Sequence, residues 1–448
     1  MSSAGEQMRR AGEAAWPWVP PVFLGLCLML GGASVRGLPQ NALLQLLALG
    51  ILLGALFLGR PLAIELRYRR GAIWCGVALV ALLALQFVPL PPSLWKLLPG
   101  RAAIAETQRL AGIVPGWMPL TVSPSATLAG VLKFLPPAAI LVSLLTQADS
   151  RAMLRSVRLV LLFAAVSVLL GVIQLSQSYP QLYFYAITNN HAAVGFFSNT
   201  NHLATLLLVA LAQTGGAWAS ARGKQEWGRS DLVRHLPYAF AAAFLVLSVF
   251  IVHSIAGIGL LAFVIPGVAL VVGGIRLPLR ASWLTATGVL ILFLAATGLA
   301  YWGFLHVASD IPGPYDRVTL FHGTMALAKA YFPIGSGLGT FSETYPLLES
   351  PDTVTQVFAN HAHNDLAELL STTGLPGVLL LLVFLFGWSW RVIEVWSRHG
   401  DADAYARAAS VATGVMMLHS LVDYPMRTSA GAGLFVLGLA MLFRTRES

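Results

Sequence analysis

The chain has 448 residues, of which 57% are apolar and only 10% are charged, and its mean hydropathy is +0.73. Soluble domains carry roughly 25% charged residues. This composition therefore excludes a water-soluble globular protein and indicates one whose outer surface faces lipid. The net charge of +9 comes from short basic segments between apolar runs. That distribution is typical of the cytoplasmic loops of membrane proteins, and it argues against a nucleic-acid-binding surface.

Apolar runs that are long enough to cross a bilayer, which takes about 20 residues, occur along the whole sequence. We therefore predict an all-α, polytopic membrane bundle of about 12 transmembrane helices, which forms a single membrane domain over residues 1–448. The predicted spans lie near residues 18–35, 41–58, 71–88, 126–146, 158–176, 199–220, 236–252, 255–273, 283–302, 374–392, 405–422 and 429–443.

The basic segments alternate with the spans and so predict the orientation. Arg9 and Arg10 precede the first span, and further basic segments follow every second span. These segments are residues 60–70, 151–158, 222–234, 276–280, 391–407 and 444–446. Because short cytoplasmic loops are enriched in Lys and Arg, both termini are predicted to lie in the cytoplasm.

The loops on the opposite side are longer and less basic, at about residues 89–125, 177–198 and 303–373. In the first of them, Trp95 and Trp117 are predicted to anchor a short helix at the membrane interface. The last is the longest, and loops of that length are usually functional or disordered. Its aromatic and glycine content favours an ordered, functional loop.

The end of this long loop carries a dense group of polar side chains just before span ten. The members are Asn360, His361, His363, Asn364, Asp365 and Glu368. Ionisable groups at membrane depth are costly, so a cluster of them predicts a functional site. A helix cap beside a hydrated interface is the alternative explanation. Gly374 and Gly377 follow, and glycine permits a close backbone approach.

Three motifs resemble those of the superfamily of bacterial O-antigen ligases and Wzy-type polysaccharide polymerases. His363 and Asn364 are followed after nine residues by Gly374 and after two more by Gly377, which matches the pattern H-N-x9-G-x-x-G. The segment GFFSNTNHLATLL (195–207) is similar to a G-x-x-x-N-x-N stretch, and residues 317–341 contain an Arg followed by a glycine-rich turn. The resemblance covers roughly residues 150–440.

The resemblance implies a GT-C-like fold and a metal-independent, inverting glycosyltransferase without a cofactor. Members of this superfamily move a glycan from undecaprenyl diphosphate to an acceptor hydroxyl at the periplasmic face of the bacterial inner membrane. A ligase uses lipid A–core as the acceptor, whereas a polymerase uses a second lipid-linked glycan. Carried onto this sequence, His363 is the essential catalytic histidine, and Arg317 is a catalytic residue that binds the donor diphosphate. The chemistry agrees, since Arg donates two hydrogen bonds to phosphate and histidine accepts protons near neutral pH.

The sequence departs from the superfamily pattern in one segment, HSIAGIG (253–259). The pattern often has S-R-x-G there, but Ile255 stands where the Arg is expected. We predict that Arg427, in the segment HSLVDYPMRT (419–428), supplies the missing diphosphate-binding cation. The alternative is that Asp423 and Arg427 form a structural ion pair. Residues predicted to support the site or to contact substrate are His361, Asn364, Asp365, Glu368, Asn199, Asn201 and Asp423.

Several alternatives remain open at this stage. Asn199 and Asn201 can bind sugar hydroxyls or cap the helix that follows them. His361 and His363 have a spacing that can bind a metal, although no cysteine lies nearby. The motifs favour a ligase over a polymerase, and the altered Ser254 segment favours a less typical member such as an exopolysaccharide polymerase. A secondary transporter is the further alternative, because twelve spans with cytoplasmic termini are a common transporter layout.

Overall fold

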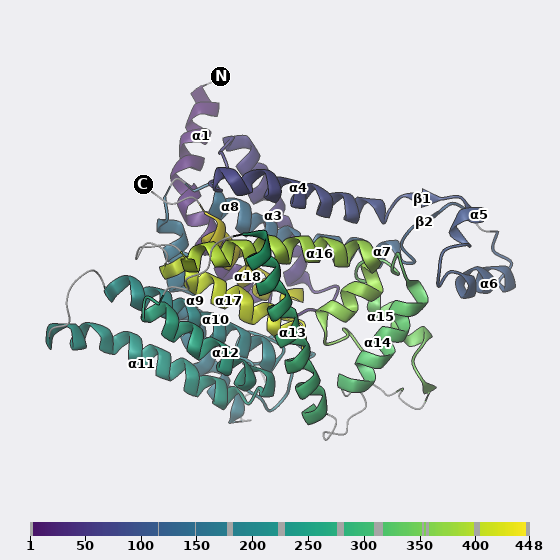
Figure 1. Ribbon diagram of the computed structural model, residues 1–448. Coiled ribbons are helices and arrows are strands. Elements are labelled where there is room, and N and C mark those ends of the chain that lie inside the picture. Colours follow the sequence, from purple (N-terminus) through teal and green to yellow (C-terminus); the bar gives the residue numbers. More distant parts are fainter. Residues whose placement is uncertain are drawn as a thin grey trace.

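The computed structural model describes residues 3–114, 116–147, 149–176, 182–222, 229–275, 282–308, 317–351, 354, 358–397 and 404–444. It confirms the predicted all-α membrane bundle, with 75% helix and 2% strand (Figure 1). Within these residues, nine helical segments are long and apolar enough to cross a membrane.

The membrane-length segments contain helices that match nine of the predicted spans. They are α2 (Val19–Leu30), α3 (Pro39–Leu58), α4 (Leu66–Leu85), α7 (Pro124–Leu132) with α8 (Leu135–Leu145), α9 (Arg151–Leu175), α10 (Thr200–Arg222), α11 (Arg229–Val252), α12 (Ile255–Val272) and α16 (Asp365–Ser397). Helices also form at the other three predicted spans. They are α13 (Trp283–Ala308), α17 (Ala404–His419) and α18 (Ser429–Phe443). The total of twelve spans stays a prediction.

Shorter elements lie outside these helices. They are α1 (Ser3–Ala15), η1 (Trp16–Trp18), β1 (Pro89–Leu90), α5 (Pro92–Trp95), α6 (Ala102–Leu110), β2 (Met118–Pro119), α14 (Arg317–Tyr331), α15 (Phe341–Thr344), η3 (Tyr345–Leu347) and η6 (Pro425–Arg427). The long loop before α16 therefore contains helices of its own, as the preference for an ordered loop predicts.

Helix α10 lies at the centre of the bundle, where α11, α12 and α17 pack around it (Figure 1). Every residue from His202 to Gly216 is buried. A helix that is surrounded on all sides has no lipid-facing stripe, and most residues of this stretch are small or apolar.

Chain segments that follow predicted spans two, four, ten and twelve meet at one end of the bundle, which we call the basic end. The amide of Ala63 donates to the carbonyl of Leu145 over 2.6 Å, and Ile64 forms a β-bridge with Arg444. Arg391 lies 2.9 Å from Glu65. This clustering agrees with the predicted alternation. Residues 276–280 and parts of three other basic segments, at 223–228, 398–403 and 445–446, lie outside the described residues.

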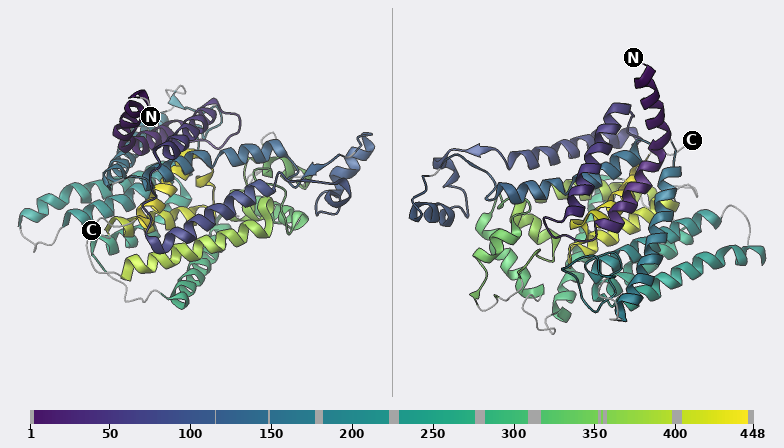
Figure 2. Two further views of the ribbon diagram at one scale, coloured as in Figure 1. Left: turned by 90° about the horizontal axis from the view of Figure 1, so that it is seen from above. Right: turned by 180° about the vertical axis from the view of Figure 1, so that it is seen from behind.

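The opposite end, which we call the site end, carries a small lobe built around the antiparallel pair of β1 and β2 together with α5 and α6. Figures 1 and 2 show this lobe extending beyond the helices of the bundle. The prediction that Trp95 anchors the loop in the interface is wrong. Its side chain is buried, and its indole N–H donates to the carbonyl of Pro119 over 2.9 Å. Trp117 is 69% exposed, so it stays available as an anchor.

Span ten differs from its predicted range, because α16 begins at Asp365 rather than near residue 374. Two carboxylates in the first turn, Asp365 and Glu368, had suggested a loop. Both are ion-paired with Arg427, and this compensation lets charged residues occupy a helix that enters the membrane.

Candidate functional site

A buried pair of His363 and Asp423 forms the centre of the candidate site. The Nδ1 atom of His363 lies 2.9 Å from Oδ1 of Asp423. The Asp423 side chain is fully buried, whereas that of His363 keeps 21% of its exposure. The backbone of His363 has a φ of 51°, a left-handed conformation that few residues other than glycine adopt. The loop therefore holds this imidazole in one orientation, with one edge on the carboxylate and the rest still accessible.

The electrostatics of this pair favour a neutral histidine and an ionised aspartate. Burial lowers the pKa of His363, and the positive charge of Arg317 lowers it further against the opposing effect of Asp423. Burial alone would raise the pKa of Asp423, but the hydrogen bond with His363 and the charge of Arg317 hold that pKa below its ordinary value. The Nδ1–H of His363 then donates to Asp423, and the Nε2 atom keeps a lone pair that can accept a proton.

Tyr424 packs against three histidines and connects two parts of the site. Its ring centroid lies 4.6 Å from those of His361 and His363 and 5.3 Å from that of His202. Burial raises the pKa of Tyr424, so the phenol keeps its proton, and Asn199 acts in the opposite direction on that pKa. Asn199, predicted as a supporting residue, is thus brought to the edge of the histidine cluster.

A second ionic group surrounds Arg427, next to the histidine pair. Its Nε atom lies 2.7 Å from Asp365 and its Nη1 atom 2.8 Å from Glu368. Glu368 also lies 3.1 Å from Nδ1 of His361 and accepts the amide of Ala362 over 3.0 Å. Burial opposes protonation, but the two carboxylates raise the pKa of Arg427. Burial lowers the pKa of His361 to about 4 even though Glu368 favours its protonated form. The alternative prediction that Arg427 pairs with Asp423 is therefore wrong, because its carboxylate partners are Asp365 and Glu368.

Local contacts at the start of α16 bring these groups together. The Asn364 side chain accepts the amide of Ala367 over 2.9 Å, so Asn364 caps the helix. The amide of Asp365 donates to the carbonyl of Ser420 over 2.7 Å. This bond ties the start of α16 to the chain that follows α17, and His363 consequently meets Asp423.

The glycine-rich turn that follows α14 packs against a break in α16 at Gly374, the first glycine of the H-N-x9-G-x-x-G motif. Gly374 has φ 61° and ψ −154°, which interrupts the helix. The amide of Leu375, just beyond it, donates to the carbonyl of Pro333 over 2.8 Å, and the amide of Gly337 donates to Thr372 over 2.8 Å. A Cβ atom at Gly374 would lie 2.1 Å from the Pro333 carbonyl oxygen. Glycine is required here because backbone meets backbone.

The remaining predicted residues lie close to this group. Asn201 accepts a hydrogen bond of 2.6 Å from the hydroxyl of Ser254, which thereby holds the start of α10. Ile255 is 53% exposed at the start of α12 and does not line the cavity described below. No described carboxylate lies within ion-pair distance of Arg317, at the start of α14. Its charge acts on His363 and Asp423.

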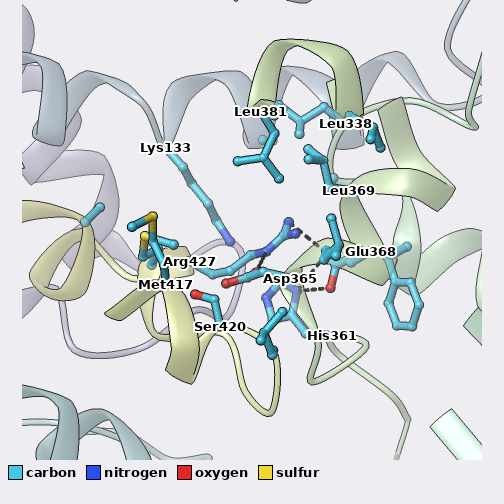
Figure 3. Close-up of a pocket in the computed structure, with 18 of the residues that line it drawn as sticks. Lys133, Leu338, His361, Asp365, Glu368, Leu369, Leu381, Met417, Ser420 and Arg427 are labelled. Atoms are coloured by element: carbon cyan, nitrogen blue, oxygen red, sulfur yellow. Dashed lines mark hydrogen bonds and ion pairs between the residues drawn. The ribbon is translucent and has the colours of Figure 1, made fainter. Parts of the chain in front are cut away.

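A cavity of about 520 Å³ lies beside Arg427, and Figure 3 shows residues that line it. Its wall is mainly apolar and includes Phe134, Leu381, Leu385 and Met417. Polar side chains also line it. They are Arg36, Lys133, Asn360, His361, Asp365, Glu368, Ser420 and Arg427. His363 is not among the lining residues, although it shares the Tyr424 ring with His361, which is. The histidine pair thus adjoins the cavity.

Sequence reasoning missed three residues of this region, namely Tyr424, Arg36 and Lys133. Tyr424 stands between two residues that the sequence did single out, but an aromatic residue near a membrane interface is common. Lys133 had a clearer signal, since it is a lone charge within an apolar run, VLKFLPP. Such a charge inside a span is a functional candidate by default.

The two histidines considered as metal ligands face different partners. His361 turns Nδ1 to Glu368 and His363 turns Nδ1 to Asp423. Within the described part of the chain, no group of three or more His, Cys, Asp or Glu side chains is arranged to hold a metal ion.

No family model and no curated protein matches the chain. The functional interpretation therefore depends on the site itself and on the resemblance of its motifs. Chemically, the site combines a proton acceptor in His363, a cation in Arg317, and a lipid-like cavity beside them.

Proposed function

We propose that the chain is a membrane glycosyltransferase that moves a glycan from a polyprenyl diphosphate, undecaprenyl diphosphate in bacteria, to an acceptor hydroxyl. The observation that carries this proposal is the His363–Asp423 pair, which adjoins an apolar cavity and on which the charge of Arg317 acts. The motif resemblance to O-antigen ligases supports the same conclusion.

In the proposed reaction, the acceptor hydroxyl donates a hydrogen bond to Nε2 of His363. Its oxygen attacks the anomeric carbon of the donor glycan from the face opposite the diphosphate, and the bond from that carbon to the diphosphate oxygen breaks. The proton passes to His363, whose new positive charge is stabilised by Asp423. Arg317 binds the diphosphate and stabilises the negative charge that grows on it as it leaves. Inversion at the anomeric carbon follows from this single displacement.

The proposal places the protein in the bacterial inner membrane, with twelve spans in a GT-C-like arrangement, both termini in the cytoplasm and the site end in the periplasm. The site end then meets acceptors that are assembled outside the cytoplasm. A ligase and a polymerase share this chemistry and differ in the acceptor. The preserved H-N-x9-G-x-x-G motif favours a ligase that uses lipid A–core, and polymerisation onto a lipid-linked glycan is the second candidate.

Reconstitution of the purified full-length protein tests the proposal. The protein receives an undecaprenyl-diphosphate-linked glycan together with either lipid A–core or a second lipid-linked repeat unit. We expect a glycosylated lipid A–core on gels and in mass spectra. Lengthened lipid-linked glycan instead identifies a polymerase. Absence of product with both acceptors, from protein that is folded and donor that a known ligase can use, contradicts the proposal.

A further inference from the structure

Lys133 lies at a break in a membrane span. Helix α7 ends at Leu132 and α8 begins at Leu135, within a single apolar segment of 22 residues. Pro136 and Pro137 lack amide hydrogens, so they cannot bond to the carbonyls of Leu132 and Lys133 and the helix is interrupted. Lys133 lies nine residues after Pro124, the first residue of α7, which corresponds to roughly 14 Å along the axis of an α-helix. Figure 3 shows its side chain reaching into the cavity toward the guanidinium of Arg427.

The ammonium of Lys133 lacks the compensation that Arg427 has. Its Nζ atom donates to the carbonyl of Ser34 over 2.8 Å. No described carboxylate lies within ion-pair distance of it, whereas Arg427 has two. Arg36, the third cation of the cavity, pairs with Glu343 over 2.9 Å near the surface. Two cations that share one cavity repel each other unless an anion lies between them.

Three cations are among the described lining residues of the cavity. Arg36 and Arg427 have carboxylate partners, whereas no described carboxylate lies within ion-pair distance of Lys133. Beyond Asp365 and Glu368, the residues of α16 that line the cavity are apolar as far as Leu385. Leu366 and Leu382 are 40% and 38% exposed, so the wall continues onto the outer, lipid-facing surface of the bundle. A mainly apolar cavity that contains a lysine with no described carboxylate partner is complementary to a lipid that has a hydrocarbon chain and an anionic head.

We propose that this cavity binds a single-chain lipid phosphate and that Lys133 is its principal phosphate-binding residue. The identification of this lipid as the polyprenyl diphosphate donor rests on the proposed function. In that case Lys133, in the cavity, and Arg317, beside His363, supply the two cations around the diphosphate, and Arg427 is held in place by its carboxylates. The absence of an Arg at Ile255 is then compensated from a different helix.

Lipid binding by the full-length protein in detergent tests this inference. The probes are undecaprenyl phosphate, undecaprenol and phosphatidylglycerol, measured by native mass spectrometry. We compare the wild type with Lys133→Met, Lys133→Arg and the matched control Lys329→Met, which removes an exposed lysine from α14 at the site end. We expect Lys133→Met to bind undecaprenyl phosphate roughly 10- to 100-fold more weakly, because a charge-assisted hydrogen bond is lost. Lys133→Arg and Lys329→Met should keep wild-type affinity, and undecaprenol should bind all four proteins equally.

Equal affinity of folded Lys133→Met and wild type for undecaprenyl phosphate overturns the inference. If phosphatidylglycerol binds as tightly as undecaprenyl phosphate, the cavity does not select a lipid with a single hydrocarbon chain, and that part of the inference is overturned. The proposed function fails separately. Lys133-dependent lipid binding without any glycan transfer rejects the glycosyltransferase and leaves the lipid site intact. Transfer with unchanged donor affinity in Lys133→Met rejects the lipid-phosphate site and leaves the glycosyltransferase intact.

Discussion

Two arginines at opposite ends of the bundle have similar partners. Each guanidinium lies between two carboxylates at 2.7 to 2.9 Å. The two groups are Arg427 with Asp365 and Glu368 at the site end, and Arg391 with Glu65 and Glu394 at the basic end.

The surroundings of the two arginines differ. All three nitrogens of Arg391 donate, because its Nε atom bonds to the carbonyl of Leu442 over 2.6 Å, and its guanidinium lies 5.3 Å from the Tyr68 ring centroid. Arg427 instead lines a cavity and faces a further cation, Lys133. A buried ion pair alone therefore does not mark a functional site. The features that distinguish the Arg427 group are a further cation, an adjoining cavity and the histidine pair beside it.

If catalysis takes place at the site end and not at the basic end, replacement of His363 by Gln should have the largest effect on function. The amide cannot accept the proton, and loss of a general base typically slows a reaction roughly 10²- to 10⁴-fold. The measurement is the initial rate of glycan transfer by the purified variant. The matched control is His322→Gln, which alters an exposed histidine of α14 and should leave the rate unchanged. A His363→Gln enzyme with more than a third of the wild-type rate contradicts the assignment.

Replacement of Arg391 by Met tests the other half of the comparison. It removes a buried cation from its pairs with Glu65 and Glu394, and breaking a buried ion pair typically costs about 3–5 kcal/mol of stability. We expect a clear fall in the melting temperature in detergent but an unchanged transfer rate for each folded molecule. Adding Glu65→Gln and Glu394→Gln to the variant should recover part of the loss. A stable variant with slow transfer would place chemistry at the basic end.

Replacement of Gly374 by Ala should have a smaller effect on activity, because it displaces the backbone near the site without removing a side chain of the site. The new Cβ atom would overlap the Pro333 carbonyl in a left-handed conformation, at a cost of about 1–3 kcal/mol. Both melting temperature and transfer rate should fall. Gly259→Ala is the matched control, because its added methyl group would have no atom within 4 Å and alanine favours a helix by about 0.5–1 kcal/mol. Equal melting temperatures and transfer rates of the two variants would contradict the requirement for glycine at position 374.

The pH dependence of transfer should give the smallest and most specific change. Only neutral His363 accepts a proton, and burial lowers its pKa below the ordinary value of about 6.5. The rate should therefore rise with pH through an inflection that lies below about pH 6.5, and it should be constant at higher pH. Asp423 raises the pKa of His363, so Asp423→Asn should move the inflection to lower pH while reducing the plateau rate. An inflection above pH 7 in the wild type would show that His363 is charged at neutral pH.

The sequence predicts the helices well where the apolar runs are long and uninterrupted, as in α9 and α10. It also predicts the cluster around His363, since ionisable side chains beside a span are rare. It misplaces the start of α16, because the cation that neutralises Asp365 and Glu368 is Arg427, which lies 62 residues after Asp365. No local pattern reports such a partner.

The role of Lys133 was missed for a related reason. Its place in the cavity depends on how α7, α8 and α16 pack, although the prolines that break the span are visible in the sequence. The junction of Pro333 with Gly374 likewise joins two motifs whose spacing along the chain does not predict their contact.

Arg101 has a practical consequence for the study of this protein. Its buried guanidinium donates to the carbonyls of Pro99, Leu120 and Gly335, which fastens the base of the lobe to the glycine-rich turn. Helix α6, just beyond it, contains no buried residue. Arg101 therefore fixes the chain just before α6, whereas α6 itself makes few contacts with the rest of the protein. For this reason α6 is a suitable place to insert an epitope or a rigid fiducial domain. Such a handle would label the site end, and its reactivity in intact cells would report directly which side of the membrane that end faces.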